Sequence, residues 1–137
     1  MIIADTSGLL TLFNRAEPQH TEVRKIVARL DEPMVVSPYV VAELDYLVAT
    51  RVGVEAELEI LAELSGGAYV LPDIGADDLA RMVDVLGRYR DQEIGVADAS
   101  ILLLAERYRT RSLLTLDHRH FDVLRPIQGG RFRLLPG

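Results

Sequence analysis

Apolar and polar residues follow two recurring patterns along the chain. Short apolar runs bounded by polar or turn-forming residues predict strands at 1–4, 34–37, 68–71, 112–116 and 131–135. Between them, apolar residues recur at spacings of three and four, which predicts helices at 8–15, 17–32, 38–53, 55–64, 77–90 and 94–108. Residues 118–125 fit a loop or a short helix. Strands that alternate with helices predict an α/β fold, in which helices cover both faces of a mostly parallel sheet.

Turn-forming residues support several of these boundaries. Ser37 and Pro38 form a good helix start, because proline is tolerated in the first turn, and Gly53 ends that helix. The next helix ends at the glycine pair 66–67. In the helix at 77–90, the spacing predicts a buried face made of Leu79, Met82, Val83 and Leu86.

Length and composition narrow the class of protein. The chain has 137 residues, which predicts a single domain spanning 1–137 with room for a real core. No apolar run approaches the ~20 residues of a membrane span, so we expect no membrane partner. The first apolar stretch is too short for a signal peptide, which favours a cytoplasmic protein. The absence of cysteine excludes disulfides and thiolate metal sites.

Charge is distributed unevenly. The formal net charge is −6, which argues against indiscriminate binding of nucleic acid. From residue 107 to residue 137, however, there are seven arginines and two aspartates, so this segment carries +5 and the rest of the chain −11. Arginine binds phosphate well through two parallel hydrogen bonds. Phosphate recognition and ordinary surface solvation both account for this segment.

Four acidic residues are placed where an α/β fold would bring them together. Asp5 and Asp117 each end a predicted strand, and the carboxyl ends of parallel strands meet at one edge of the sheet. Asp98 lies near the start of the helix at 94–108. Glu43 lies in the second turn of the helix at 38–53, and its apolar neighbours predict that it points inward.

Each acid alone has a simpler structural explanation. Asp5 and Asp98 could cap or neutralise helix N-termini, Asp117 could serve a turn, and Glu43 could pair with an arginine. Four converging carboxylates, however, would repel one another strongly unless a cation lay between them. Oxygen ligands without cysteine suit Mg²⁺ or Mn²⁺. Such an ion lowers the pKa of a bound water and stabilises charge developing on a phosphodiester.

Four segments of the chain resemble the PIN-domain ribonucleases, and most closely the VapC toxins of type II toxin–antitoxin operons. They are DTS (5–7), SPYVVAELDYL (37–47), GVADASILLLAERY (95–108) and LLTLDHRHF (113–121). The resemblance extends over essentially the whole chain. It implies a PIN-like three-layer α/β/α fold with a five-stranded parallel sheet in the order 3-2-1-4-5, which makes the first and fourth strands neighbours.

The resemblance also assigns roles to the site residues. It implies that Asp5 and Asp98 bind Mg²⁺, for which Mn²⁺ can substitute, and that Glu43 and Asp117 act through water or a second ion. Asp122 is the alternative to Asp117 as the fourth acid. The hydroxyl groups that match those supporting the acids in the family belong to Thr6 or Ser7 and to Thr115.

The function implied is that of a toxin that inhibits translation by cutting structured RNA, either the sarcin–ricin loop of 23S rRNA or a tRNA. The implied partners are a VapB antitoxin and a second copy of the chain, with the helices in 38–66 as a docking surface. His118, Arg119 and His120 follow the fourth acid directly, and we predict that they contact RNA.

Two other functions share features with this sequence. Phosphatases of the haloacid dehalogenase kind also end the first strand with Asp, but they carry a second Asp two residues later, where this chain has Ser7. The other alternative is a non-catalytic PIN-like module that binds RNA or protein. The complete set of acids argues against such a module.

Overall fold

The computed structural model describes all residues from Met1 to Gly137. Its centre is a five-stranded sheet in the order β3-β2-β1-β4-β5, in which all neighbouring strands are parallel. The strands are β1 (Ile3–Ala4), β2 (Met34–Val36), β3 (Tyr69–Val70), β4 (Ser112–Leu114) and β5 (Arg133–Leu135). The predicted fold class and strand order are thereby confirmed, and each strand lies inside its predicted range.

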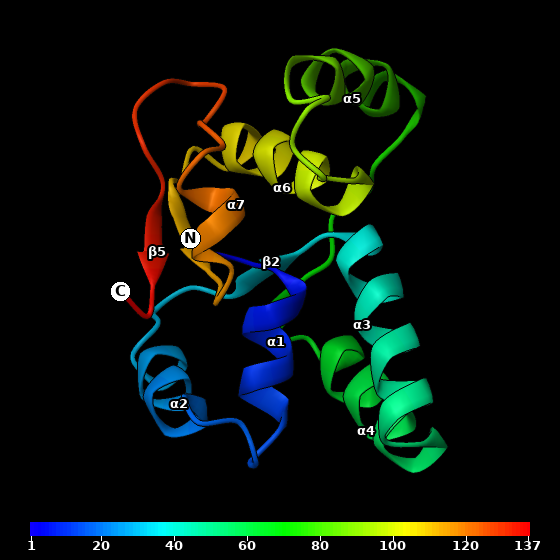
Figure 1. The fold of residues 1–137 in the computed structure, drawn as a ribbon. Coiled ribbons are helices and arrows are strands. Elements are labelled where there is room, and N and C mark those ends of the chain that lie inside the picture. The colour runs from blue at the N-terminus through cyan, green and yellow to red at the C-terminus, as the bar shows by residue number, and fades with distance from the viewer.

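Helices cover both faces of the sheet (Figure 1). Helices α5 and α6 lie on one side, and α1 to α4 lie mostly on the other. Their bounds are α1 (Thr6–Phe13), α2 (His20–Ala28), α3 (Pro38–Arg51), α4 (Val54–Ser65), α5 (Ala76–Arg88), α6 (Val96–Arg107) and the short α7 (His118–Phe121). Helix α1 begins two residues earlier than its spacing predicted, because Asp5 caps it directly after β1.

Burial explains the most apolar segments. Strands β1 and β2 are buried throughout, and α6 is buried continuously from Ala99 to Ala105. Helix α6 is therefore packed on all sides along this stretch, which explains why its sequence is apolar around the whole helix rather than amphipathic.

Helix α5 buries only part of the face that its spacing predicted, since Met82 is buried and Leu86 is partly buried against the core. Met82 and Val85 are buried, whereas Leu79 and Val83 are 44% and 70% exposed. The helix contacts the molecule mainly through α6, so only a narrow stripe is covered. The prediction of Leu79 and Val83 as core residues was wrong, since apolar spacing alone does not say which of two adjacent stripes finds a partner.

Several arginines of the basic C-terminal segment serve the fold. Arg107 binds Asp78 at 3.1 Å and the carbonyl of Asp73, and Arg111 donates to the carbonyl of Gly129 at 2.7 Å. These contacts tie α6 and β4 to neighbouring loops. None of the helices is both long enough and apolar enough to span a membrane.

Candidate active site

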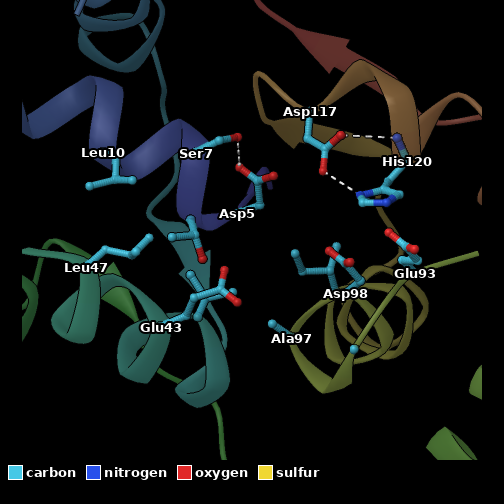
Figure 2. A pocket seen from close by; sticks show the side chains of 14 residues that line it. Asp5, Ser7, Leu10, Glu43, Leu47, Glu93, Ala97, Asp98, Asp117 and His120 are labelled. Carbon is cyan, nitrogen blue, oxygen red and sulfur yellow. Dashed lines mark hydrogen bonds and ion pairs between the residues drawn. The ribbon is translucent and has the colours of Figure 1, made fainter.

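A cavity of about 370 Å³ opens beyond the carboxyl ends of β1 and β4, at the point where the strand order reverses. Open α/β sheets commonly bind ligands at this position. The cavity is bounded by the N-terminal parts of α1, α3 and α6 and by α7 (Figure 2). Its polar lining residues are Asp5, Thr6, Ser7, Glu43, Glu93, Asp98, Asp117 and His120. The structure thus brings the four predicted acids to one cavity, from four separate segments of the chain.

Asp5 is the most buried of these acids, with 7% of its surface exposed. Its Oδ1 accepts hydrogen bonds from the Ser7 hydroxyl and the Gly8 amide, both at 2.8 Å, and its Oδ2 accepts one from the Thr115 hydroxyl. Burial raises the pKa of Asp5 to about 6, although these hydrogen bonds act in the opposite direction. The carboxylate is therefore held in a fixed orientation and largely shielded from solvent.

Of the three hydroxyl groups predicted to support the acids, two contact Asp5. Ser7 also accepts from the amide of Leu116 at 2.9 Å, and Thr115 accepts from the amide of Asp117 at 2.9 Å. These contacts join the start of α1 to the end of β4. The third hydroxyl, on Thr6, is buried and has no hydrogen-bond partner, although Thr6 lines the cavity.

Glu43 and Asp98 are positioned by two helix starts that touch. Ser37 caps α3 by accepting from the amide of Tyr39, and its hydroxyl lies 2.6 Å from that of Ser100 on α6. Because both hydroxyls are buried, this contact fixes the first turn of α3 against that of α6.

Asp98 is half-buried in the first turn of α6. Burial raises its pKa to about 6, and the negative charges of Asp5, Asp117 and Glu43 add to this effect, while His120 lowers the pKa. Glu43, in contrast, is an exposed residue whose side chain lies at the cavity. We predicted that Glu43 points inward rather than into solvent. Its side chain faces the cavity, but the residue is exposed, because its apolar neighbours on α3 pack on another side of the helix.

Asp117 caps α7. Its Oδ1 accepts from the backbone amide of His120 at 3.1 Å, and its Oδ2 lies 2.8 Å from Nδ1 of the same residue. Asp122, the alternative fourth acid, is exposed at the other end of α7 and does not line the cavity. Of the three residues predicted to contact RNA, only His120 lines the cavity, while His118 and Arg119 are exposed beside it.

Glu93 was not predicted as a site residue. This residue lies in the loop between α5 and α6, and its carboxylate faces the cavity near Asp98 (Figure 2). The only available signal was its place shortly before the helix that carries Asp98, since loop residues have no periodicity that predicts their direction.

Comparisons with known proteins agree with this geometry. The model of the PIN domain family matches residues 2–125. The chain is 56% identical over 135 residues to Ribonuclease VapC26 of Mycobacterium tuberculosis (strain ATCC 25618 / H37Rv), an alignment that covers 98% of this chain and 100% of the relative. The chain belongs to the PIN-domain family, among the VapC proteins.

Solved structures of other proteins share the fold of this VapC-type chain. One is the crystal structure of Mycobacterium tuberculosis VapC20, described as a sarcin–ricin-loop-cleaving toxin, with a TM-score of 0.79 and 20% identity over 85% of this chain and 90% of that one. Another is FitAcB from Neisseria gonorrhoeae, with a TM-score of 0.56 and 20% identity over 82% of this chain and 85% of that one.

The donor set of this VapC-type cavity fits a hard divalent cation. Five carboxylates and one imidazole line the cavity, and no lysine or arginine does. Oxygen-rich sites of this kind suit Mg²⁺ or Mn²⁺. No three of the Asp, Glu or His side chains are yet close enough to enclose an ion. Since like charges repel, an ion would draw these side chains together or bind some of them through water. The unpaired hydroxyl of Thr6 is a further polar group available to a ligand.

The raised pKa of Asp5 predicts how the stability of the metal-free protein depends on pH. Its pKa of about 6 lies above the ordinary 3.8, so Asp5 contributes stability that is fully present below 3.8 and is lost as the pH rises through 6. The two-unit difference corresponds to about 3 kcal/mol of unfolding free energy. Urea unfolding in EDTA, from about pH 4 to about pH 8, measures the loss.

The matched control is Asp5→Asn, which cannot titrate. The difference in unfolding free energy between this variant and the parent should grow in favour of the variant as the pH rises. If the difference in unfolding free energy stays constant over this pH range, burial does not raise the pKa of the Asp5 carboxyl.

Proposed function

We propose that this VapC-type protein is a divalent-metal-dependent endoribonuclease and the toxin of a type II toxin–antitoxin system. The convergence of carboxylates from four separate segments, in a cavity that no lysine or arginine lines, is the observation that carries this proposal. Carboxylates at this density serve phosphodiester hydrolysis when a cation balances them. The 56% sequence identity to Ribonuclease VapC26 over nearly the whole chain supports the same reaction.

Asp5 and Asp98 are proposed to hold the Mg²⁺ or Mn²⁺ ion, and Glu43 and Asp117 to complete the set less directly. When bound, the ion supplies a water of lowered pKa and offsets negative charge on the scissile phosphate. The chain's own residues orient the ligands. Ser7, Gly8 and Thr115 donate hydrogen bonds to Asp5 and leave its carboxylate little freedom to rotate.

The proposed substrate is structured RNA, with the sarcin–ricin loop of 23S rRNA first and tRNA as the alternative. The overall resemblance to VapC toxins favours the rRNA loop. Arg119 and His118 are exposed on α7 beside the cavity, where they can meet phosphates on either side of the cut bond. The acidic average charge of the chain suits an enzyme that binds RNA at one site rather than over its whole surface.

A VapB-type antitoxin and a second copy of the chain are the proposed partners, and the cytoplasm is the proposed location. Helices α3 and α4 and the turn that joins them expose apolar side chains that a partner could cover. These residues are Tyr46, Val52, Val54, Leu58 and Leu61. Burial of exposed apolar side chains is the main favourable term in most protein association.

The experiment that tests the function is cleavage of total bacterial RNA by the purified, antitoxin-free protein. Incubation with Mg²⁺ or Mn²⁺ should produce new 5′ ends at a few discrete positions, and EDTA should abolish them. Mapping those ends identifies the RNA and the bond.

Two results would contradict the proposal. RNA binding without metal-dependent cuts by a well-folded protein would favour the non-catalytic PIN-like module. Hydrolysis of p-nitrophenyl phosphate with no cutting of RNA would favour the phosphatase.

A further inference from the structure

Both carboxylate oxygens of Asp117 are occupied by the same residue. The Oδ1 atom accepts the backbone amide of His120 at 3.1 Å, and Oδ2 lies 2.8 Å from the ring nitrogen Nδ1. A backbone bond and a side-chain bond from one residue hold the imidazole in a single orientation (Figure 2). In this structure, Asp117 therefore fixes the position of the His120 ring.

This contact also assigns the nitrogens of the imidazole ring. An ionised carboxylate only accepts hydrogen bonds, so Nδ1 of His120 carries the proton that Asp117 Oδ2 receives. The other nitrogen, Nε2, has no hydrogen-bond partner within the chain. In the neutral ring Nε2 presents a lone pair, which is the form in which histidine binds metals.

The imidazole lies among the acids of the cavity. Figure 2 shows it between Asp117 and the carboxylates of Asp98 and Glu93. His120, Asp98 and Glu93 all line this one cavity. A lone pair that faces carboxylates is unfavourable unless a proton or a metal cation lies between them.

We propose that His120 binds the divalent ion through Nε2, and that Asp117 acts on the ion by orienting this ring. This inference rests on the proposed metal-dependent function and deepens it. A carboxylate that holds the far nitrogen of a histidine ligand is a common arrangement around protein-bound metals. Because imidazole suits transition metals better than Mg²⁺, the site should favour Mn²⁺ over Mg²⁺.

Pulsed electron paramagnetic resonance of Mn²⁺ bound to the purified protein tests the inference, because it detects a directly bound imidazole nitrogen. The key variant is His120→Asn, whose amide can still donate to Asp117 Oδ2 but does not reach the position of Nε2. The matched control is His118→Asn, on the same short helix but outside the cavity.

The nitrogen coupling should be present in the parent and in His118→Asn, and absent in His120→Asn. Titration calorimetry should show that Mn²⁺ binds the His120→Asn variant about tenfold or more weakly, with a smaller loss for Mg²⁺. Asp117→Asn should also weaken Mn²⁺ binding, since it removes the carboxylate that orients the ring. Circular dichroism confirms that each variant is folded.

Two results would overturn the inference, and they differ in what they say about the function. Mn²⁺ bound to the parent without nitrogen coupling, or coupling that persists in His120→Asn, contradicts the role of His120 but leaves metal-dependent cleavage intact. A parent protein that binds no Mn²⁺ and cuts no RNA contradicts the proposed function together with this inference.

Discussion

Replacing Asp5 with asparagine is expected to abolish RNA cleavage and, in the absence of metal, to make the fold more stable. The variant loses the negative charge that we propose holds the ion. Metal ions contribute several kcal/mol to such reactions, so the rate should fall about a hundredfold or more. Cleavage of the RNA target identified by 5′-end mapping, under single-turnover conditions with Mg²⁺, measures the loss.

The gain in stability follows from the surroundings of Asp5. The Asn oxygen can still accept from the Gly8 amide, and its amide group can donate to the Thr115 hydroxyl, so the cap of α1 is preserved. At pH 7.5 the parent protein must keep a buried carboxylate ionised, although burial raises its pKa to about 6. Asparagine avoids that cost. Activity and stability should therefore change in opposite directions, as is common where a site stores unfavourable interactions.

Asp122→Asn is the control for this experiment. Asp122 is an acid of the same segment as Asp117, but it is exposed and lies outside the cavity, so the variant should cut RNA at the parental rate. Normal cleavage by Asp5→Asn would mean that the ion is not held at the end of β1. Loss of cleavage in Asp122→Asn would mean that Asp122, and not Asp117, is the fourth acid of the site.

The fold could be predicted because its signals are local. Strands such as 34–36 are continuous apolar runs, and Ser37 with Pro38 marks the start of α3. The parallel sheet followed from the alternation of strands and helices, while the strand order came from the resemblance to the family. The exposed side of α5 could not be predicted in the same way. Whether Met82 or Val83 is covered depends on how α6 lies against α5, which is a property of the tertiary structure.

The acids of the site could be found because three of them stand at strand ends or in the first turn of a helix. Their surroundings could not be found in this way. The contact between Asp117 and His120 depends on side-chain rotamers within a four-residue helix, and Glu93 depends on the path of a loop. Glu43 lies at the cavity, but its exposure to solvent was not predicted, since its neighbours indicate which face of α3 is apolar and not where the cavity opens.

Replacing Gly8 with alanine is expected to destabilise the protein by about 2–3 kcal/mol, which lowers the melting temperature by roughly 10 °C. Gly8 lies in the first turn of α1, where the helix passes over the end of β4. A methyl group at this position would lie 2.3 Å from the carbonyl oxygen of Leu114 and 2.8 Å from its carbonyl carbon. Both atoms belong to the backbone of a buried strand, so α1 or β4 has to move.

That movement should also impair the site, because the same close approach lets Ser7 and Asp5 reach Thr115 across the two elements. Thermal unfolding followed by circular dichroism measures the stability, and cleavage at a temperature where the variant is folded measures the site. Gly87→Ala in α5 is the control. Its new methyl group would meet only the end of the Arg90 side chain, at 3.6 Å, and alanine favours helices by up to about 1 kcal/mol over glycine. If Gly8→Ala were as stable as Gly87→Ala, α1 would not lie directly against β4, and the hydrogen bonds that hold Asp5 would need another arrangement.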